Sequence, residues 1–215
     1  MKAAIVLQDL ETLDFSRLET HFEECLRDLS FDDAGELDVI LMDEFESSAY
    51  LDTILGKLYS SAREVFLNKG LYLTSINVLF GKCAVSSLDL DWLYVPKESL
   101  KKHFNHRNYK VFEQPVIQGY SYSGENYLAD VNKYKVSALG GTFDHIHDGH
   151  KILLSVAAFL TSSKLIIGIT DEELLLKKKY KEFLEPFDKR ADNVKHFLSL
   201  LKPALTAQIV PIKDV

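Results

Sequence analysis

The sequence of 215 residues has few of the features that mark secreted or membrane proteins. Only two cysteines are present, Cys25 and Cys83, and they lie far apart without the spacing of metal ligands. Buried free thiols are therefore expected in place of a disulfide. No run of about eighteen apolar residues could span a bilayer, and Asp9 and Glu11 make the amino terminus unlike a cleavable signal. These absences predict a globular cytoplasmic protein with no membrane partner.

The chain also lacks the basic excess typical of nucleic-acid-binding proteins, because its formal net charge is −7. The negative charge is concentrated in residues 1–130, which carry 12 Lys and Arg against 22 Asp and Glu. Residues 131–215 carry 13 against 10, a net charge of +3. No nucleic-acid partner is expected, and the local basic excess fits small anionic substrates.

Residues 1–104 alternate between strand and helix patterns, which predicts an amino-terminal α/β domain. Five apolar residues recur at helical spacing in its long helix and should face the core: Leu51, Ile54, Leu55, Leu58 and Ala62. The expected elements are strands at 3–7, 37–42, 71–80 and 88–95, helices at 16–29 and 48–68, and a short helix at 96–101. Residues 105–132 are polar and tyrosine-rich without periodicity, so we expect a linker or surface loop there.

Residues 133–215 are expected to form a Rossmann-like, doubly wound parallel sheet. Ligands of such sheets bind in the crevice at the carboxyl ends of the strands. The expected elements are strands at 134–139, 164–169 and 206–210, helices at 149–161 and 186–201, and a short helix from Asp171.

The run from Gly140 to His150 lies between an apolar strand pattern and an apolar helix pattern. Gly140 and Gly141 allow close approach of backbone to a ligand, and the amides and positive dipole at the following helix start attract phosphate. His147 and His150 are three residues apart, so both rings can bond one phosphate group. The combination predicts a nucleotide-binding active site. Three histidines and two aspartates also suggest a metal site, but without a cysteine pair or His-Glu-x-x-His spacing no metal site is expected.

This run, Gly-Gly-Thr-Phe-Asp-x-x-His-x-Gly-His, resembles the first signature of the nucleotidylyltransferase superfamily that carries a Thr/His-x-Gly-His motif. Within that superfamily, residues 145–151 are most similar to eukaryotic phosphopantetheine adenylyltransferases. The likeness covers residues 133–215, and residues 51–59 are more weakly similar to the amino-terminal region of the fungal, stand-alone form. The resemblance implies transfer of AMP from ATP to 4′-phosphopantetheine, which yields dephospho-coenzyme A and pyrophosphate. Mg²⁺ arriving with ATP is the implied cofactor.

The resemblance also implies roles for individual residues. His150 would stabilise charge growing at the α-phosphorus, His147 would contact the α- and β-phosphates, and Thr142 would hydrogen-bond the attacking phosphate. Phe143 would either pack beneath the adenine or fill the core. Asp144 would either brace the turn through backbone amides or touch the ligand. His145 is given no catalytic role.

A lysine run, Lys177, Lys178, Lys179 and Lys181, follows the second expected strand of this domain. Such a run is ordinarily a solvated face. Related enzymes place a lysine here to hold the substrate phosphate, so the resemblance implies that Lys178 or Lys179 orients 4′-phosphopantetheine.

The second superfamily signature, similar to Ile-Ser-Ser-Thr-x-x-Arg, does not occur in the sequence. We therefore expect a portion of a longer enzyme, with a partial nucleotidylyltransferase domain. Two alternatives remain: a cytidylyltransferase acting on a phosphorylated alcohol such as ethanolamine phosphate, and a noncatalytic assembly or ligand-binding module. Candidate partners are ATP, 4′-phosphopantetheine, another coenzyme A pathway enzyme and a second copy of the chain.

Overall fold

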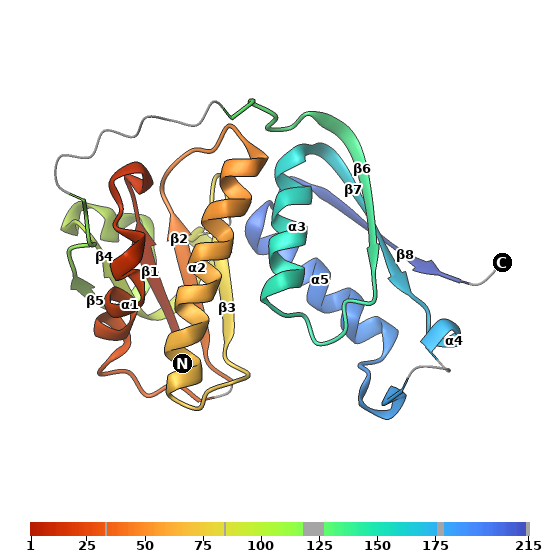
Figure 1. Cartoon of the computed structure of the whole chain (residues 1–215), viewed down its shortest axis with the longest axis horizontal. Helices are drawn as coiled ribbons and strands as arrows, with labels where there is room; N and C mark the ends of the chain where they lie inside the picture. Colours follow the sequence, from red (N-terminus) through yellow and green to blue (C-terminus); the bar gives the residue numbers. More distant parts are fainter. Residues whose placement is uncertain (33, 84, 118–126, 176–178, 214–215) are drawn as a thin grey trace. The chain divides into compact units, whose positions relative to one another are not determined.

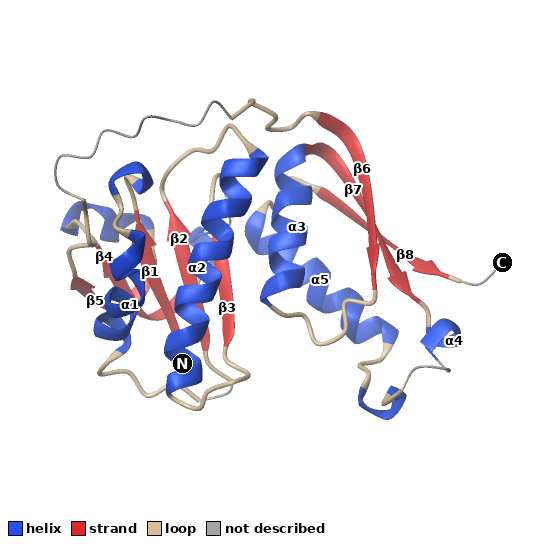
Figure 2. Cartoon of the chain, viewed as in Figure 1, coloured by secondary structure: helices blue, strands red, loops and turns tan. Residues whose placement is uncertain are grey.

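The computed structural model describes residues 1–32, 34–83, 85–117, 127–175 and 179–213. The chain forms two compact units. Unit 1 comprises Met1–Phe45 with Ala49–Leu128, and unit 2 comprises Glu46–Ser48 with Ala129–Val215. Figure 1 colours the two units along the sequence, and Figure 2 distinguishes their helices and strands.

Unit 1 is built on a five-stranded, fully parallel sheet with the strand order β3-β2-β1-β4-β5. Its strands are β1 (Lys2–Leu7), β2 (Glu36–Leu41), β3 (Ser75–Leu79), β4 (Asp89–Val95) and β5 (Asn105–Val111). Almost every residue of β1, β2 and β3 is buried, as expected for parallel strands with covered faces. The predicted strands 3–7, 37–42 and 88–95 are confirmed within a residue or two, whereas β3 is shorter than the predicted 71–80.

Two α-helices pack on one face of this sheet, α1 (Leu18–Leu26) and α2 (Ser48–Asn68) (Figure 2). All five apolar residues predicted to face the core from α2 are buried. Gly70, with φ 73°, ends α2 because its left-handed backbone lets the Leu71 N–H reach the Phe66 carbonyl at 2.9 Å. Short 3-10 helices complete the unit: Leu10–Thr12, Phe15–Arg17, Val85–Ser87 and Glu98–His103. None of the described helices combines the length and apolar character needed to cross a bilayer.

The expectation of a linker or loop beginning at residue 105 is wrong for β5. This strand pairs in parallel with β4, from Asp89 opposite Asn105 to Val95 opposite Val111. Most of its side chains are exposed because it is the edge of the sheet. An exposed edge strand needs no apolar alternation, and polar or charged residues there discourage pairing with other chains. The sequence therefore carried no periodic signal for this strand.

Unit 2 contains a three-stranded parallel sheet in the order β6-β7-β8. The strands are β6 (Tyr134–Gly141), β7 (Thr161–Thr170) and β8 (Thr206–Ile212), and the helices are α3 (Asp148–Leu160), α4 (Glu172–Leu175), α5 (Phe187–Leu201) and the 3-10 turn Lys181–Phe183. Helices α3 and α5 lie on the same face of the sheet (Figure 1). On the other face, Val136 and Ile212 remain 50% and 38% exposed. The predicted parallel α/β fold is confirmed.

Burial on α2 predicts the effect of shortening its side chains. Leu55→Ala should lower the free energy of unfolding by about 2–5 kcal/mol, because Leu55 is fully buried and its loss leaves a cavity. Leu67→Ala on the same helix is the matched control, and it should change stability by less than about 0.5 kcal/mol because Leu67 is 40% exposed. Urea unfolding followed by circular dichroism measures both, and equal effects would contradict this packing.

Candidate active site

The candidate site lies in the turn of residues 142–147 between β6 and α3. Phe143 and His145 have φ values of 54° and 42°, in the left-handed region that non-glycine residues seldom adopt. Such conformations cost about 1–3 kcal/mol each and persist only where surrounding contacts impose them. The turn is therefore held in its shape by its neighbours.

The two histidines of the motif stack at the start of α3. Their ring centroids are 3.9 Å apart, with 29° between the ring planes. His147 is the cap residue of α3, and the first bond of the helix runs from the Lys151 N–H to the His147 carbonyl at 3.0 Å. The positive end of the helix dipole lies at this point. The structure thus brings His147 and His150 to one place, as the sequence predicted.

His150 favours the neutral imidazole. Burial lowers the pKa of His150, the nearby His147 lowers it further, and Asp144 acts in the opposite direction. Its Nδ1 atom is buried and has no hydrogen-bond partner among the described residues. The ring leans on Phe143, with 5.1 Å between the ring centroids. A neutral imidazole can donate one hydrogen bond to a phosphate oxygen.

The structure places Phe143 in the core, because its side chain has no exposed surface. Of the two roles considered for Phe143, filling the core is therefore the one that the structure shows. This burial leaves no surface for stacking on an adenine.

The glycines of the motif allow close packing within the chain. A Cβ at Gly141 would lie 3.1 Å from Cε2 of Phe143, and a Cβ at Gly149 would lie 3.2 Å from Cε1 of His147. A Cβ at Gly140 would lie 3.3 Å from Cδ1 of Ile212 on β8. The glycines therefore let the Phe143 ring, the His147 ring and β8 approach the motif closely.

A second segment, Phe183–Glu185, clamps the turn. The Asp144 carboxylate accepts a hydrogen bond from the Glu185 N–H at 2.8 Å, and the Glu185 carboxylate accepts one from the His145 N–H at 3.0 Å. The His145 ring atom Nε2 lies 2.9 Å from the Phe183 carbonyl, and this contact raises the pKa of His145. Of the two roles considered for Asp144, bracing the turn is the one that this structure shows.

Of the two lysines predicted to hold the substrate phosphate, the structure describes only Lys179. Lys178 lies outside the described residues. Lys179 is exposed, and its ammonium lies 4.7 Å from the centroid of the Tyr180 ring. Thr142 directly follows β6, and its carbonyl accepts a hydrogen bond from Arg190 at 2.8 Å. Within the described part of the chain, no three His, Cys, Asp or Glu side chains are grouped as metal ligands would be.

Comparison with known proteins finds relatives of this part of the chain. Residues 138–213, which include the turn, α3, β7, α5 and β8, match the family model described as cytidylyltransferase-like. The matched residues make up most of the carboxyl-terminal unit, which is therefore similar to this family. The predicted superfamily is thereby confirmed.

Several relatives of this domain are phosphopantetheine adenylyltransferases. The chain is 43% identical to that protein of Saccharomyces cerevisiae over 195 residues, which are 84% of this chain and 61% of the yeast protein. It is 41% identical over 70 residues to the Pyrococcus furiosus enzyme, covering 33% of this chain and 43% of that protein. It is 34% identical over 87 residues to the Methanopyrus kandleri protein, covering 40% of this chain and 54% of that protein. The chain thus spans about three fifths of the length of its yeast relative.

Sequence reasoning missed two residues that shape this unit. Glu185 carried no signal, because its contacts join segments about 40 residues apart. Arg190 did carry one: it shares the apolar stripe of α5 with Val194, Phe197 and Leu201, and its side chain is fully buried. A charged residue at a core-facing position of a helix indicates a buried polar role.

The opposite pKa shifts of His150 and His145 predict the order in which they titrate. We expect His150 to lose its proton below its ordinary pKa of 6.5 and His145 above it. The stability contributed by His145 is lost as pH rises through its raised pKa. The effect of His150 is opposite: it makes the folded state more stable as pH rises from its lowered pKa to 6.5. His147→Asn should raise the pKa of His150 by removing a like charge. NMR titration of the imidazole signals measures the pKa values of His145 and His150 in the unmodified chain and in the variant. A pKa of His150 above that of His145 would contradict the geometry.

Gly149→Ala should change the arrangement of the two histidine rings without lowering the stability of the fold. Alanine favours the helix by up to about 1 kcal/mol, so stability should be unchanged or slightly higher. The new Cβ would meet the His147 ring, so the His147 and His150 imidazole signals should shift. Thermal unfolding and NMR of the same sample test this, and unchanged imidazole signals would refute the close contact.

Proposed function

We propose that the protein is a pantetheine-phosphate adenylyltransferase, which transfers AMP from ATP to 4′-phosphopantetheine and releases pyrophosphate. The observation that carries the proposal is the stacked pair His147 and His150 at the start of α3, next to the glycine turn that ends β6. The 43% identity to the yeast phosphopantetheine adenylyltransferase, which extends over 84% of the chain, supports this choice of substrates.

The reaction is an in-line displacement. An oxygen of the 4′-phosphate forms a bond to the α-phosphorus of ATP, while the bond from that phosphorus to the bridging oxygen breaks and its electrons leave with pyrophosphate. Catalysis then depends on position and on hydrogen-bond donors directed at the growing charge. No covalent bond to the protein forms.

The residues of the turn supply these donors. In the proposal, His150 bonds a non-bridging oxygen of the α-phosphate, His147 contacts the α- and β-phosphates, and Thr142 holds the attacking phosphate. Lys178 or Lys179 orients 4′-phosphopantetheine by its charge. The neutral state of His150 suits this role, because it enters the transition state as a hydrogen-bond donor. Mg²⁺ arriving with ATP would screen the charge of the triphosphate. A cytoplasmic location stays a prediction.

A second candidate is a cytidylyltransferase acting on a phosphorylated alcohol. The description of the matching family as cytidylyltransferase-like favours it. The same histidine chemistry would serve either nucleotide, so a direct comparison of ATP with CTP distinguishes the two.

Pyrophosphate release tests the proposal. ATP with 4′-phosphopantetheine should give turnover, and His150→Ala should lower kcat by about 10²–10³-fold, the usual effect of losing one donor to a developing charge. His196→Ala is the matched control, because His196 is exposed on α5 of the same unit, and it should leave kcat unchanged.

The yeast relative assayed in parallel serves as the positive control. Turnover with CTP and ethanolamine phosphate but not with ATP would replace the proposal by the second candidate. No turnover by this chain beside an active yeast enzyme would show that it is not an adenylyltransferase on its own.

A further inference from the structure

Arg190 occupies an unusual position in unit 2. Its side chain is fully buried on α5, and it donates to three backbone carbonyls. Nη1 lies 2.8 Å from the Thr142 carbonyl and 2.9 Å from the Thr170 carbonyl, and Nε lies 2.9 Å from the Glu185 carbonyl. One planar group therefore holds three separate segments.

The three carbonyls belong to the segments that form the site. Thr142 is the first residue after β6 and Thr170 is the last residue of β7. These strands are adjacent and parallel, with Gly141 opposite Ile169. Glu185 is the residue whose carboxylate binds the His145 N–H. The guanidinium thus links the turn that carries the histidines, the neighbouring strand end and the clamp.

Stability alone does not explain a guanidinium here. Nη2 is buried without a hydrogen-bond partner among the described residues, and no described carboxylate lies within ion-pair distance of Arg190. A buried donor left unpaired and a buried cation without a counterion both oppose folding. An apolar side chain of similar size would avoid both costs. Lysine would keep the charge, but it lacks the rigid planar fork that holds several acceptors in one geometry.

We propose that Arg190 is a positioning residue of the active site. By joining the Thr142, Thr170 and Glu185 carbonyls, it sets the geometry in which His147 and His150 meet the phosphates of a nucleotide. The proposal rests on the proposed function only in naming a nucleotide as the ligand. The placement of the histidines by Arg190 is tested without turnover.

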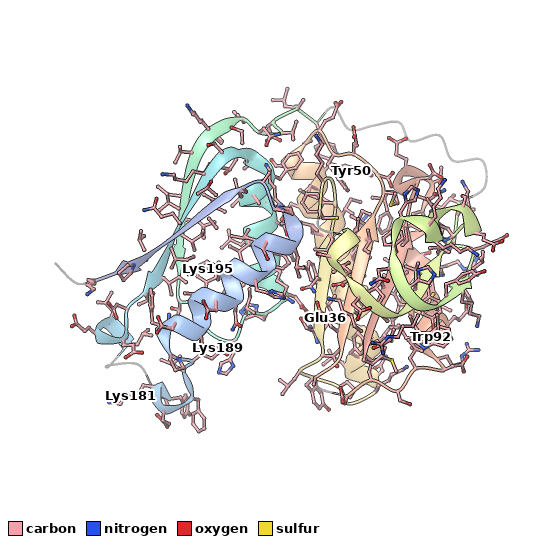
Figure 3. The ribbon with its side chains drawn as sticks, turned by 180° about the vertical axis from the view of Figure 1, so that it is seen from behind. Glu36, Tyr50, Trp92, Lys181, Lys189 and Lys195 are labelled. Carbon is pink, nitrogen blue, oxygen red and sulfur yellow. The ribbon has the colours of Figure 1, made fainter. Side chains whose placement is uncertain are left out.

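Arg190→Lys tests the placement directly, because it keeps the positive charge and removes the fork. We expect the imidazole signals of His147 and His150 to shift and the pKa of His150 to move toward its ordinary value, in a domain that retains its circular dichroism spectrum. Lys195→Met is the matched control, because it removes an exposed positive charge from the same helix, on which Figure 3 labels Lys189 and Lys195. It should leave both histidines unchanged. A folded Arg190→Lys variant with unchanged histidine signals would overturn the proposal.

A measurement on the unmodified chain applies even if Arg190→Lys does not fold. The Arg190 Nε–H signal should exchange with water at least about 100-fold more slowly than that of exposed Arg107, and addition of Mg·ATP should shift it together with the His150 signal. Fast exchange, or a His150 signal that shifts while the Arg190 signal does not, would show that the fork does not hold the site.

Turnover adds an independent readout if the chain is active. A misplacement of about 1 Å in a reacting group can cost about 100-fold in rate. We expect Arg190→Lys to lower kcat by about 10–100-fold while KM for ATP changes by less than about threefold. Equal losses in kcat and thermal stability, with the histidine signals intact, would instead indicate a merely structural role. Absence of turnover with shifted histidine signals would count against the proposed function and leave the positioning role of Arg190 supported.

Discussion

Parallel pairing of β6 with β7 is the constraint on which the candidate site depends. Because the strands run in the same direction, both end at one edge of the sheet, with Gly140 opposite Gly168 and Gly141 opposite Ile169. A Cβ at Gly168 would lie 2.8 Å from Cδ1 of Ile212, so glycine lets the end of β8 close over the same edge. The turn with its histidines, Thr170 and the clamp then come within reach of one arginine.

The two units show how little the fold alone decides about chemistry. In both units the first three strands run parallel and are joined by helices, and the order β3-β2-β1 repeats the order β8-β7-β6. In unit 1, however, the Gln8 N–H donates to the Gln114 side chain at 3.1 Å, and that side chain donates back to the Gln8 carbonyl. The Ile117 N–H also reaches the Thr12 carbonyl at 2.9 Å. Unit 1 thus fills the carboxyl end of β1 with its own chain, whereas unit 2 carries histidines at the corresponding place.

The sequence predicted the parts of this structure that rest on periodicity or local chemistry. Helix α2 was predicted from 48 to 68 and occupies Ser48–Asn68, because its apolar spacing and Gly70 define its face and its end. The stacked histidines follow from their spacing at a helix start. By contrast, β5 is stabilised by backbone pairing to β4 and left no side-chain pattern. The Glu185 clamp and the Arg190 carbonyl contacts join residues distant in sequence, so only the folded chain shows them.

We propose that the β6–α3 turn of unit 2 binds the phosphates of a nucleotide. Titration of the isotope-labelled full chain with a non-hydrolysable Mg·ATP analogue, followed by NMR, tests it most directly. We expect saturable shifts concentrated at Gly140, Gly141, His147 and His150, with residues 8–17 of unit 1, which follow β1, unchanged. Shifts confined to unit 1, or no saturable shift at the two histidines, would contradict it.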